Sequence, residues 1–238
     1  MASLGDLLAV IHDATMRARP AQLTVEEWRH NDRAGAAWDA FVRARHPRGY
    51  APASNPTPEA PEESRSTVRL VYDGPERYRE ESAGRQAGVR YIVRDGDRWL
   101  TWDKDWGVVS SDSQPEDAPP ASTLGFMLDP VELTAALRFG PPMEGTVAGR
   151  ASLTVSATER EGNPSSVALS VGAGADVVEL SFDAETGALL RSEATLDGEP
   201  FHRLEVTDIA YGPVPATAFV VEPPPGHEGA AGRPYVPR

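Results

Sequence analysis

The sequence contains no cysteine, so it offers no disulfide, no thiol nucleophile and no cysteine for N-terminal lipid attachment. It also lacks any apolar run of about 18 residues, the length that a membrane-spanning helix needs. Residues 1–13 have no basic region, and Asp6, His12 and Asp13 interrupt their apolar residues. We therefore expect neither an export signal nor a membrane-spanning helix.

Signatures of catalysis are absent as well. The sequence has no G-x-S-x-G nucleophile elbow, and its histidines do not show the spacing of paired metal ligands. Gly172 and Gly174 precede a predicted strand rather than the helix that a phosphate site requires. The segment 103–107 is better explained as a hairpin turn than as a calcium loop. Although ligands can converge in space, we expect no catalytic residues, no metal ion and no cofactor.

The charge balance is strongly acidic. The chain carries 36 Asp and Glu residues against 23 Lys and Arg residues, a net charge of −13. This charge opposes sequence-independent binding to nucleic acids and adsorption on anionic lipid surfaces. With 238 residues, 40% of them hydrophobic, the chain is long enough to bury one sizeable core. We expect a single domain over residues 1–238, with no nucleic-acid partner and no integral membrane segment.

Several segments are expected to flank or decorate this domain. Ser3 precedes apolar residues at helical spacing, so residues 1–19 predict an amphipathic helix packed on the domain. Residues 46–64 contain five prolines and predict a surface loop, and residues 222–238 predict a tail rich in proline and glycine. A further helix is predicted at 33–44, capped by Asp32.

The last third of the sequence is its most informative region. Apolar residues alternate there with polar ones, the period-2 pattern of a strand with one wet face, at Val178, Leu180 and Phe182. Tight turns lead from this strand to two more, over 188–196 and 201–211, which predicts an antiparallel meander. Further strands are predicted at 21–30, 67–72, 77–81, 88–94, 97–102, 107–110, 167–171 and 214–221.

A family resemblance rests on this meander. Its segments are DAETGALLRSE at 183–193, GEPF at 198–201 and EVTDIA at 205–210, followed by Phe219, Pro223 and Gly226. They resemble the closing strands of the LolA/LppX/RseB-like superfamily, and upstream 145–155 and 95–99 resemble earlier strands of that family. The likeness covers roughly residues 65–226. It implies an α+β fold in which a curved antiparallel sheet forms a half-barrel, with helices covering its concave face and a hydrophobic cavity between them.

The interior segment 122–139 is the candidate cover of that cavity. It predicts two short helices separated at Asp129-Pro130, because proline suits the first turn of a new helix. Their apolar residues either form a lid over a ligand cavity or fill the concave face as ordinary core, since close-packed interiors are the rule. The residues expected to line the cavity or its lid are Phe126, Met127, Val131, Leu133, Leu137, Val178, Leu180 and Phe182.

A basic cluster lies at the end of the helix predicted at 33–44 and consists of Arg43, Arg45, His46 and Arg48. Cations stabilise the negative end of a helix dipole, which is the structural explanation. The functional alternative is a docking site for an acidic segment of a protein partner.

Taken together, the sequence predicts a non-catalytic protein that holds a lipid, an acyl chain or a hydrophobic peptide. The alternative is a regulatory or scaffolding protein whose half-barrel is filled and which binds a protein partner; a hydrolase has the least support. The resemblance implies work outside the cytoplasmic membrane, reached by a signal peptide. Either the signal has been removed from this sequence, or the chain is a cytoplasmic branch, which Met1-Ala-Ser favours.

Overall fold

The computed structural model describes residues 2–16, 19–45, 61–84, 88–103, 107–113, 121–160 and 166–223. Its helices are α1 (Leu4–Met16), α2 (Asn31–Arg45), α3 (Gly125–Leu128), α4 (Val131–Ala136), α5 (Ser166–Gly172) and the 3-10 helix η1 (Ala216–Phe219). Its strands are β1 (Ala21–His30), β2 (Glu63–Tyr72), β3 (Arg77–Gly84), β4 (Gly88–Asp95), β5 (Arg98–Asp103), β6 (Gly107–Ser110), β7 (Leu137–Phe139), β8 (Met143–Val147), β9 (Arg150–Glu159), β10 (Val177–Asp183), β11 (Leu189–Leu196) and β12 (Glu199–Tyr211).

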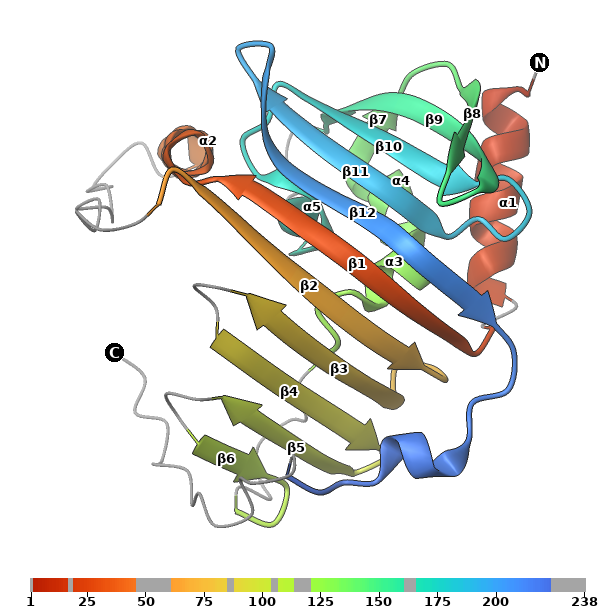
Figure 1. Ribbon diagram of the computed structural model, residues 1–238. Helices are drawn as coiled ribbons and strands as arrows, with labels where there is room; N and C mark the ends of the chain where they lie inside the picture. Colours follow the sequence, from red (N-terminus) through yellow and green to blue (C-terminus); the bar gives the residue numbers. More distant parts are fainter. Residues whose placement is uncertain are drawn as a thin grey trace. The chain divides into compact units, whose positions relative to one another are not determined.

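These elements make an α+β fold with one large antiparallel sheet and a few helices, as the sequence predicted (Figure 1). The 12-stranded sheet runs in the order β6-β5-β4-β3-β2-β1-β12-β11-β10-β9-β7, and β8 also pairs with β9. The predicted meander is present as β10, β11 and β12, which are adjacent in this order.

Internal contacts divide the chain into two compact units. The first unit comprises Met1–Arg17, Glu26–Arg65 and Phe126–Val206, and the second comprises Ala18–Val25, Ser66–Gly125 and Thr207–Arg238. The division falls inside β1, β2 and β12. The number of domains expected from the sequence stays a prediction.

In the first unit, helices lie on one face of the strands β9 to β12 (Figure 1). Helix α5 packs against β11, and α4 packs against α1 and α5. On β10, alternation brings Leu180 and Phe182 to the buried face, where both are fully inaccessible to solvent. Burial of such apolar side chains stabilises the unit, at about 1.5–3 kcal/mol for each large residue.

The turn between β10 and β11 packs closely against α1 and is held by hydrogen bonds to a buried carboxylate. Gly187 has φ +76, and a Cβ built on it would lie 2.4 Å from the Val10 carbonyl oxygen, so glycine is required there. Asp183, 1% exposed, accepts hydrogen bonds from the amides of Glu185 at 2.9 Å and Thr186 at 3.0 Å, and pairs with Arg150. Burial alone would raise the pKa of Asp183, but these hydrogen bonds hold it below its ordinary value.

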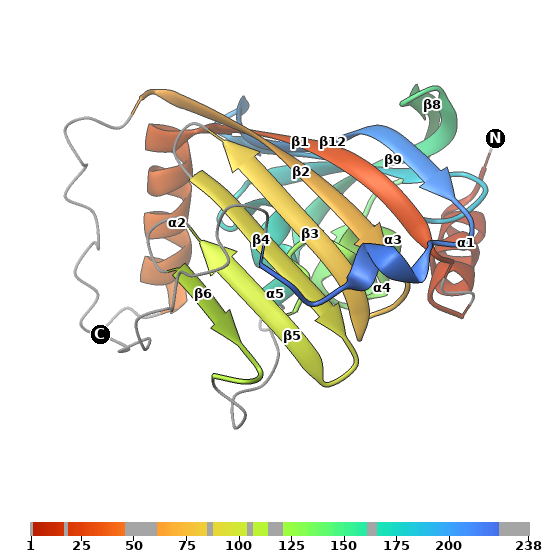
Figure 2. The same ribbon diagram turned by 60° about the horizontal axis from the view of Figure 1, so that its bottom comes forward.

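In the second unit, β2 to β6 pair in chain order as an antiparallel series of hairpins. The pairing of Asp95 with Arg98 leaves a tight turn between β4 and β5, and the Asp95-Gly96 dipeptide is of the kind that favours a hairpin. The helix η1 packs against β3 and β4 (Figure 2). An apolar cluster forms on these strands from Tyr91, Val93, Leu100 and Trp102, with Val108 and Val221 packed against it.

Two predicted strands are wrong. Residues 167–171 lie in helix α5, because a short apolar run does not by its periodicity distinguish a buried strand from a buried helix. Residues 214–221 contain the 3-10 helix η1 instead of a strand. Pro213 and Pro215 lie at the start of that segment, and proline has no N–H to donate to a strand ladder.

Other boundaries also differ from the sequence analysis. Leu137, expected at the end of a helix, is the first residue of β7 and pairs with Glu159. Strand β2 begins at Glu63, within the range expected to be loop, while the loop residues 46–60 and the tail residues 224–238 lie outside the described residues. Trp99 and Trp102, three positions apart on β5, are both buried.

Candidate binding site beside helix α2

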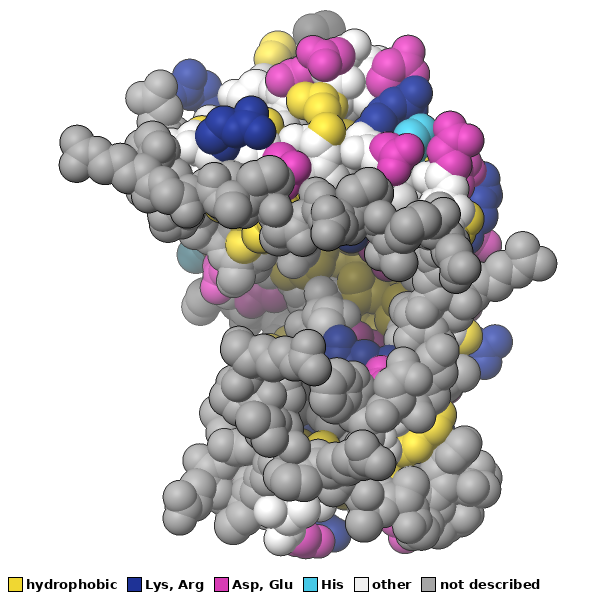
Figure 3. Space-filling model, turned by 90° about the vertical axis from the view of Figure 1, so that its left-hand side faces the viewer, with side chains coloured by type: hydrophobic (Ala, Val, Ile, Leu, Met, Phe, Trp, Pro, Cys, Tyr) yellow, Lys and Arg dark blue, Asp and Glu magenta, His cyan; other side chains and the backbone are white. Residues whose placement is uncertain are grey.

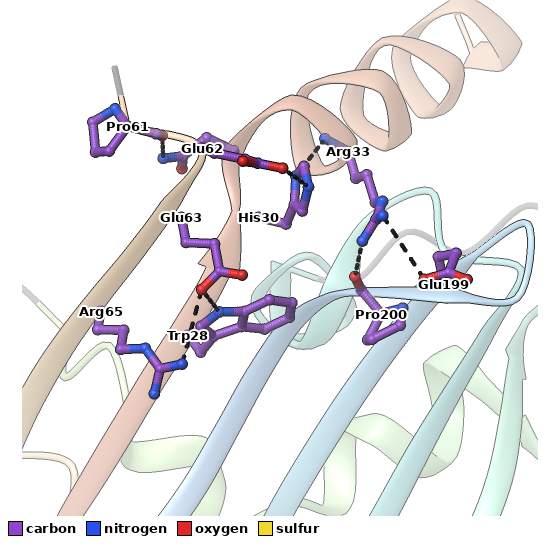
Figure 4. A network of polar contacts seen from close by, with 10 residues as sticks. Trp28, His30, Arg33, Pro61, Glu62, Glu63, Arg65, Glu199 and Pro200 are labelled. Carbon is purple, nitrogen blue, oxygen red and sulfur yellow. Dashed lines mark hydrogen bonds and ion pairs between the residues drawn. The ribbon is translucent and has the colours of Figure 1, made fainter. Parts of the chain in front are cut away.

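The site begins where β1 ends and α2 starts without an intervening loop. The cap expected from the sequence, Asp32, lies inside the helix; the residue before the helix is His30, whose Nδ1 accepts a hydrogen bond from the Arg33 amide at 3.4 Å. His30 is 8% exposed, and its Nε2 lies 3.4 Å from a carboxylate oxygen of Glu62 (Figure 4). An imidazole therefore takes the capping role that carboxylates and hydroxyls usually fill.

Polar contacts from the residues just before β2 and from β12 hold the first turn of α2 in place (Figure 4). The side-chain amide of Asn31 donates to the Pro61 carbonyl at 2.8 Å. Arg33 donates to the Pro200 carbonyl at 3.2 Å and lies 3.8 Å from the Glu199 carboxylate. The direction of α2 as it leaves the sheet is thus set by side-chain chemistry at its start.

Close packing fixes the rest of the helix. Gly174, in the turn between α5 and β10, has φ +77, and a Cβ built on it would lie 2.0 Å from the Ala37 carbonyl oxygen. At the other end, Arg45 pairs with Glu159 on β9, donates to the Phe41 carbonyl at 3.3 Å and stacks over the Phe41 ring at 3.5 Å. Helix α2 is therefore held at both ends and along one side.

A pocket of about 330 Å³ lies between β1, α2, α5 and β12. This volume is at the lower end of the range of ligand pockets, about 300–1,000 Å³. We call it the corner pocket, and its lining residues are Glu27, Arg29, Ala34, Trp38, Leu169, Ser170, Gly172, Ala173, Phe201 and His202.

Apolar side chains are unusually accessible at the corner pocket. Trp38 is 42% exposed and Leu169 is 36% exposed. Among the described residues, six large hydrophobic side chains are exposed, and these two line the same pocket. Phe201, by contrast, is buried and forms part of the pocket wall. Such accessible apolar surface around a concave site is typical of ligand binding.

Charged groups share the pocket with these apolar residues. His202 Nε2 lies 3.1 Å from a carboxylate oxygen of Glu27, a contact that links β12 to β1. Arg29 is exposed. On the face in Figure 3, acidic, basic and hydrophobic side chains are interspersed over the described surface, without one extended basic patch. The pocket is therefore amphipathic, in a molecule whose overall charge is negative.

The residues expected to form a cavity or lid all lie in the first unit. Met127, Leu133, Leu180 and Phe182 are fully buried, Leu137 and Val178 are nearly so, and Phe126 and Val131 are half-buried. Leu137 and Val178 line a small space of about 10 Å³, which shares Gly172 and Ala173 with the corner pocket. Whether these residues form a lid or ordinary core stays a prediction.

The basic cluster at the end of α2 falls partly within the described residues. Arg45 is committed to Glu159 and to its own helix, as described above, whereas Arg43 is exposed. His46 and Arg48 lie outside the described residues. The contacts of Arg45 are those of a helix-capping cation, and docking of an acidic partner stays a prediction.

Sequence reasoning missed the residues of the corner pocket. Trp38 stacks on Phe41 with ring centroids 5.5 Å apart, yet it is 42% exposed, and no local pattern in the sequence indicates that exposure. Leu169 lay in a segment assigned to a strand. Glu27 and His202 are 175 positions apart in the chain, and no motif joins them.

The described residues were also compared with the requirements of a membrane-spanning helix and of a metal site. No described helix has both the length and the apolar character needed to cross a membrane. Within the same ranges, no three histidine, aspartate or glutamate side chains are grouped so as to hold a metal ion.

Comparison with known proteins gives matches of fold. No family model and no curated protein matches the chain. MucB of Pseudomonas aeruginosa, in its complex with MucA, is similar with a TM-score of 0.46 and 18% identity, over 89% of this chain and 58% of that chain. An uncharacterised conserved protein of Thermus thermophilus matches with a TM-score of 0.50 and 11% identity, over 94% of this chain and 96% of the other.

A LolA superfamily protein of Nitrosomonas europaea matches with a TM-score of 0.32 and 9% identity, over 92% of this chain and 98% of the other. The chain thus spans 58% of the MucB chain and nearly the full length of the other two. All three matches lie below 25% identity, so these likenesses concern the fold alone.

Proposed function

We propose that this chain is a non-catalytic binding protein that holds a lipid, an acyl chain or a hydrophobic peptide, with the corner pocket as its point of entry. The observation that carries the proposal is the pairing of Trp38 and Leu169, two exposed apolar side chains on the wall of a 330 Å³ pocket. Each methylene that a ligand buries there contributes about 0.8 kcal/mol, so a short segment of chain suffices for binding.

The pocket's position indicates where such a chain runs. Gly172 and Ala173 separate the corner pocket from the small space lined by Leu137 and Val178. An acyl chain that enters beside Trp38 is therefore directed toward the residues that the sequence analysis assigned to a cavity lid. In this proposal the sheet curves around the helices as a half-barrel, and a shift of the α5–β10 turn opens the inner space.

A fluorescent fatty-acid analogue titrated into the full chain tests the proposal. We expect saturable binding by the wild type and roughly tenfold weaker binding by Leu169→Asp, because a charge replaces apolar contact area. Leu8→Asp is the matched control, since Leu8 is 39% exposed on α1 and does not line the pocket. Equal weakening by both variants, or no binding by the wild type, contradicts the proposal.

The second candidate function is regulatory or scaffolding binding of a protein, favoured by the open edge of β8. Four of its five residues are exposed, and Met143 is 61% exposed. A strand edge of this kind can accept a further strand from a partner. Native mass spectrometry of the gently purified chain separates the two functions: a co-purifying mass in the lipid range supports the first, and ligand-free protein that retains a protein partner supports the second.

A further inference from the structure

The corner pocket contains an arginine that forms no ion pair with a described residue. Arg29 lines the pocket from β1 and is exposed, and its side chain makes no ion pair or hydrogen bond with any described residue. Other arginines of the first unit do have described partners. Arg33 contacts Pro200 and Glu199, and Arg150 pairs with Asp183. The guanidinium of Arg29 is therefore available to a ligand.

The acidic residue that lines the pocket, Glu27, is engaged by another side chain. Glu27 is directed to His202, with 3.1 Å between the imidazole Nε2 and the carboxylate oxygen. Glu27 and Arg29 are two positions apart on β1, so both side chains project to the same face of the strand. The pocket thus presents an engaged carboxylate and an available guanidinium beside exposed apolar side chains.

We propose that the pocket selects an amphipathic ligand with an anionic head, a carboxylate or a phosphate monoester, which Arg29 binds while the apolar chain lies against Trp38 and Leu169. The guanidinium offers two parallel N–H donors that match both kinds of anion. This inference rests on the proposed binding function and adds the class of ligand.

Only charges close to the pocket can select the head group of a ligand. The net charge of −13 repels anions at long range, whereas screening confines such effects to about 8–10 Å at physiological salt. An anion that reaches the pocket therefore responds mainly to the charges that line it, of which Arg29 is the exposed cation. Apolar contact supplies the affinity, and the guanidinium supplies the discrimination between head groups.

Isothermal titration calorimetry of the full chain with matched single-chain probes tests the inference. The probes are lauric acid, lauryl phosphate and lauryl alcohol, each below the concentration at which it aggregates. We expect the wild type to bind at least one anionic probe about tenfold more tightly than the alcohol, the effect of one charge-assisted hydrogen bond. Comparison of the two anions shows which head group the pocket takes.

Two variants decide whether Arg29 is responsible. Arg29→Gln is expected to remove the preference for the anions and to leave affinity for the alcohol within about twofold. Arg138→Gln changes the net charge equally from an exposed position on β7 outside the pocket and is expected to retain the preference. Binding of all three probes with equal affinity, or a preference that persists in Arg29→Gln, overturns this inference alone. Absence of binding by every probe overturns the proposed function as well.

Discussion

In the turn between β10 and β11, the Asp183 carboxylate accepts hydrogen bonds from two backbone amides and pairs with the Arg150 guanidinium. In the corner pocket, by contrast, Arg29 has no such partner among the described residues. The apolar residues differ in the same way, because Phe182 beside the turn is fully buried and Trp38 at the pocket is 42% exposed. Satisfied groups in a buried turn stabilise the fold, while accessible groups in a pocket leave contacts for a ligand. Substitutions in the two regions should therefore change different measurements.

The largest expected effect is the loss of the Asp183 carboxylate. Asp183→Ala leaves the Arg150 guanidinium and two amides without their acceptor, and we expect the free energy of unfolding to fall by about 3–5 kcal/mol. Urea denaturation measures the change. Glu185→Ala is the control: Glu185 is 75% exposed and lies 3.2 Å from the same Arg150, so its loss should cost about 0–1 kcal/mol. Equal costs for both variants would show that the turn does not depend on its buried acid.

The pH dependence of stability should reveal the same group. The pKa of Asp183 is lowered in the folded protein, so its contribution is present above the unfolded pKa of about 3.9 and is lost as the pH falls through the folded pKa. Burial acts to raise the pKa of Glu193, but the hydrogen bonds from Arg203 and Arg191 outweigh it, so this pKa is also lowered. Protonation of Glu193 at low pH therefore destabilises the folded protein as well. Urea denaturation between pH 7 and pH 3 should therefore show a shallower decline for Asp183→Asn than for the wild type. Parallel declines contradict this assignment.

A smaller effect is expected where the turn contacts α1. Gly187→Ala introduces a Cβ against the Val10 carbonyl at a left-handed backbone position, and should cost about 2–3 kcal/mol. Gly198→Ala is matched in backbone geometry, with φ +80, but a Cβ there meets nothing within 4 Å. The control should cost only about 1 kcal/mol, the conformational part alone. Thermal or urea unfolding of both variants separates the contact from the conformation.

The end of α2 should respond more weakly. Arg45→Ala removes an ion pair with Glu159 and a cation at the helix terminus, for an expected cost of about 1 kcal/mol. Arg43→Ala removes an exposed charge from the same last turn of the helix and should change stability by under about 0.5 kcal/mol. Urea denaturation of both variants measures the difference. Should Arg43→Ala instead abolish salt-sensitive recovery of a protein partner, the docking role of the basic cluster gains support over capping.

The smallest effect on stability is expected in the pocket itself. Trp38→Ser removes a half-exposed ring that stacks on Phe41, and we expect a cost of no more than about 1 kcal/mol. The same variant should lose much of its affinity for the fluorescent fatty-acid analogue. A large loss of stability with unchanged binding would reverse the distinction drawn between the two regions.

Local patterns in the sequence were sufficient for most strands and for the buried turn. The alternation of Leu180 and Phe182 with polar neighbours predicts one buried face, because successive side chains of a strand point to opposite sides. Asp183 and Gly187 likewise mark a turn through their own backbone preferences. The assignment of 167–171 failed because a short apolar run suits either a strand or a helix, and packing of α5 on β11 decides between them.

The meander and the acidic character of the protein thus follow from the amino-acid sequence, since each depends on composition or on neighbours within a few positions. The contact of Glu27 with His202 across 175 positions, and the convergence of Trp38, Leu169 and Arg29 on one pocket, depend instead on the folded chain. Such convergence depends on strand order and on the packing of helices over long sequence distances. Those are properties of the whole chain's free energy rather than of any local pattern.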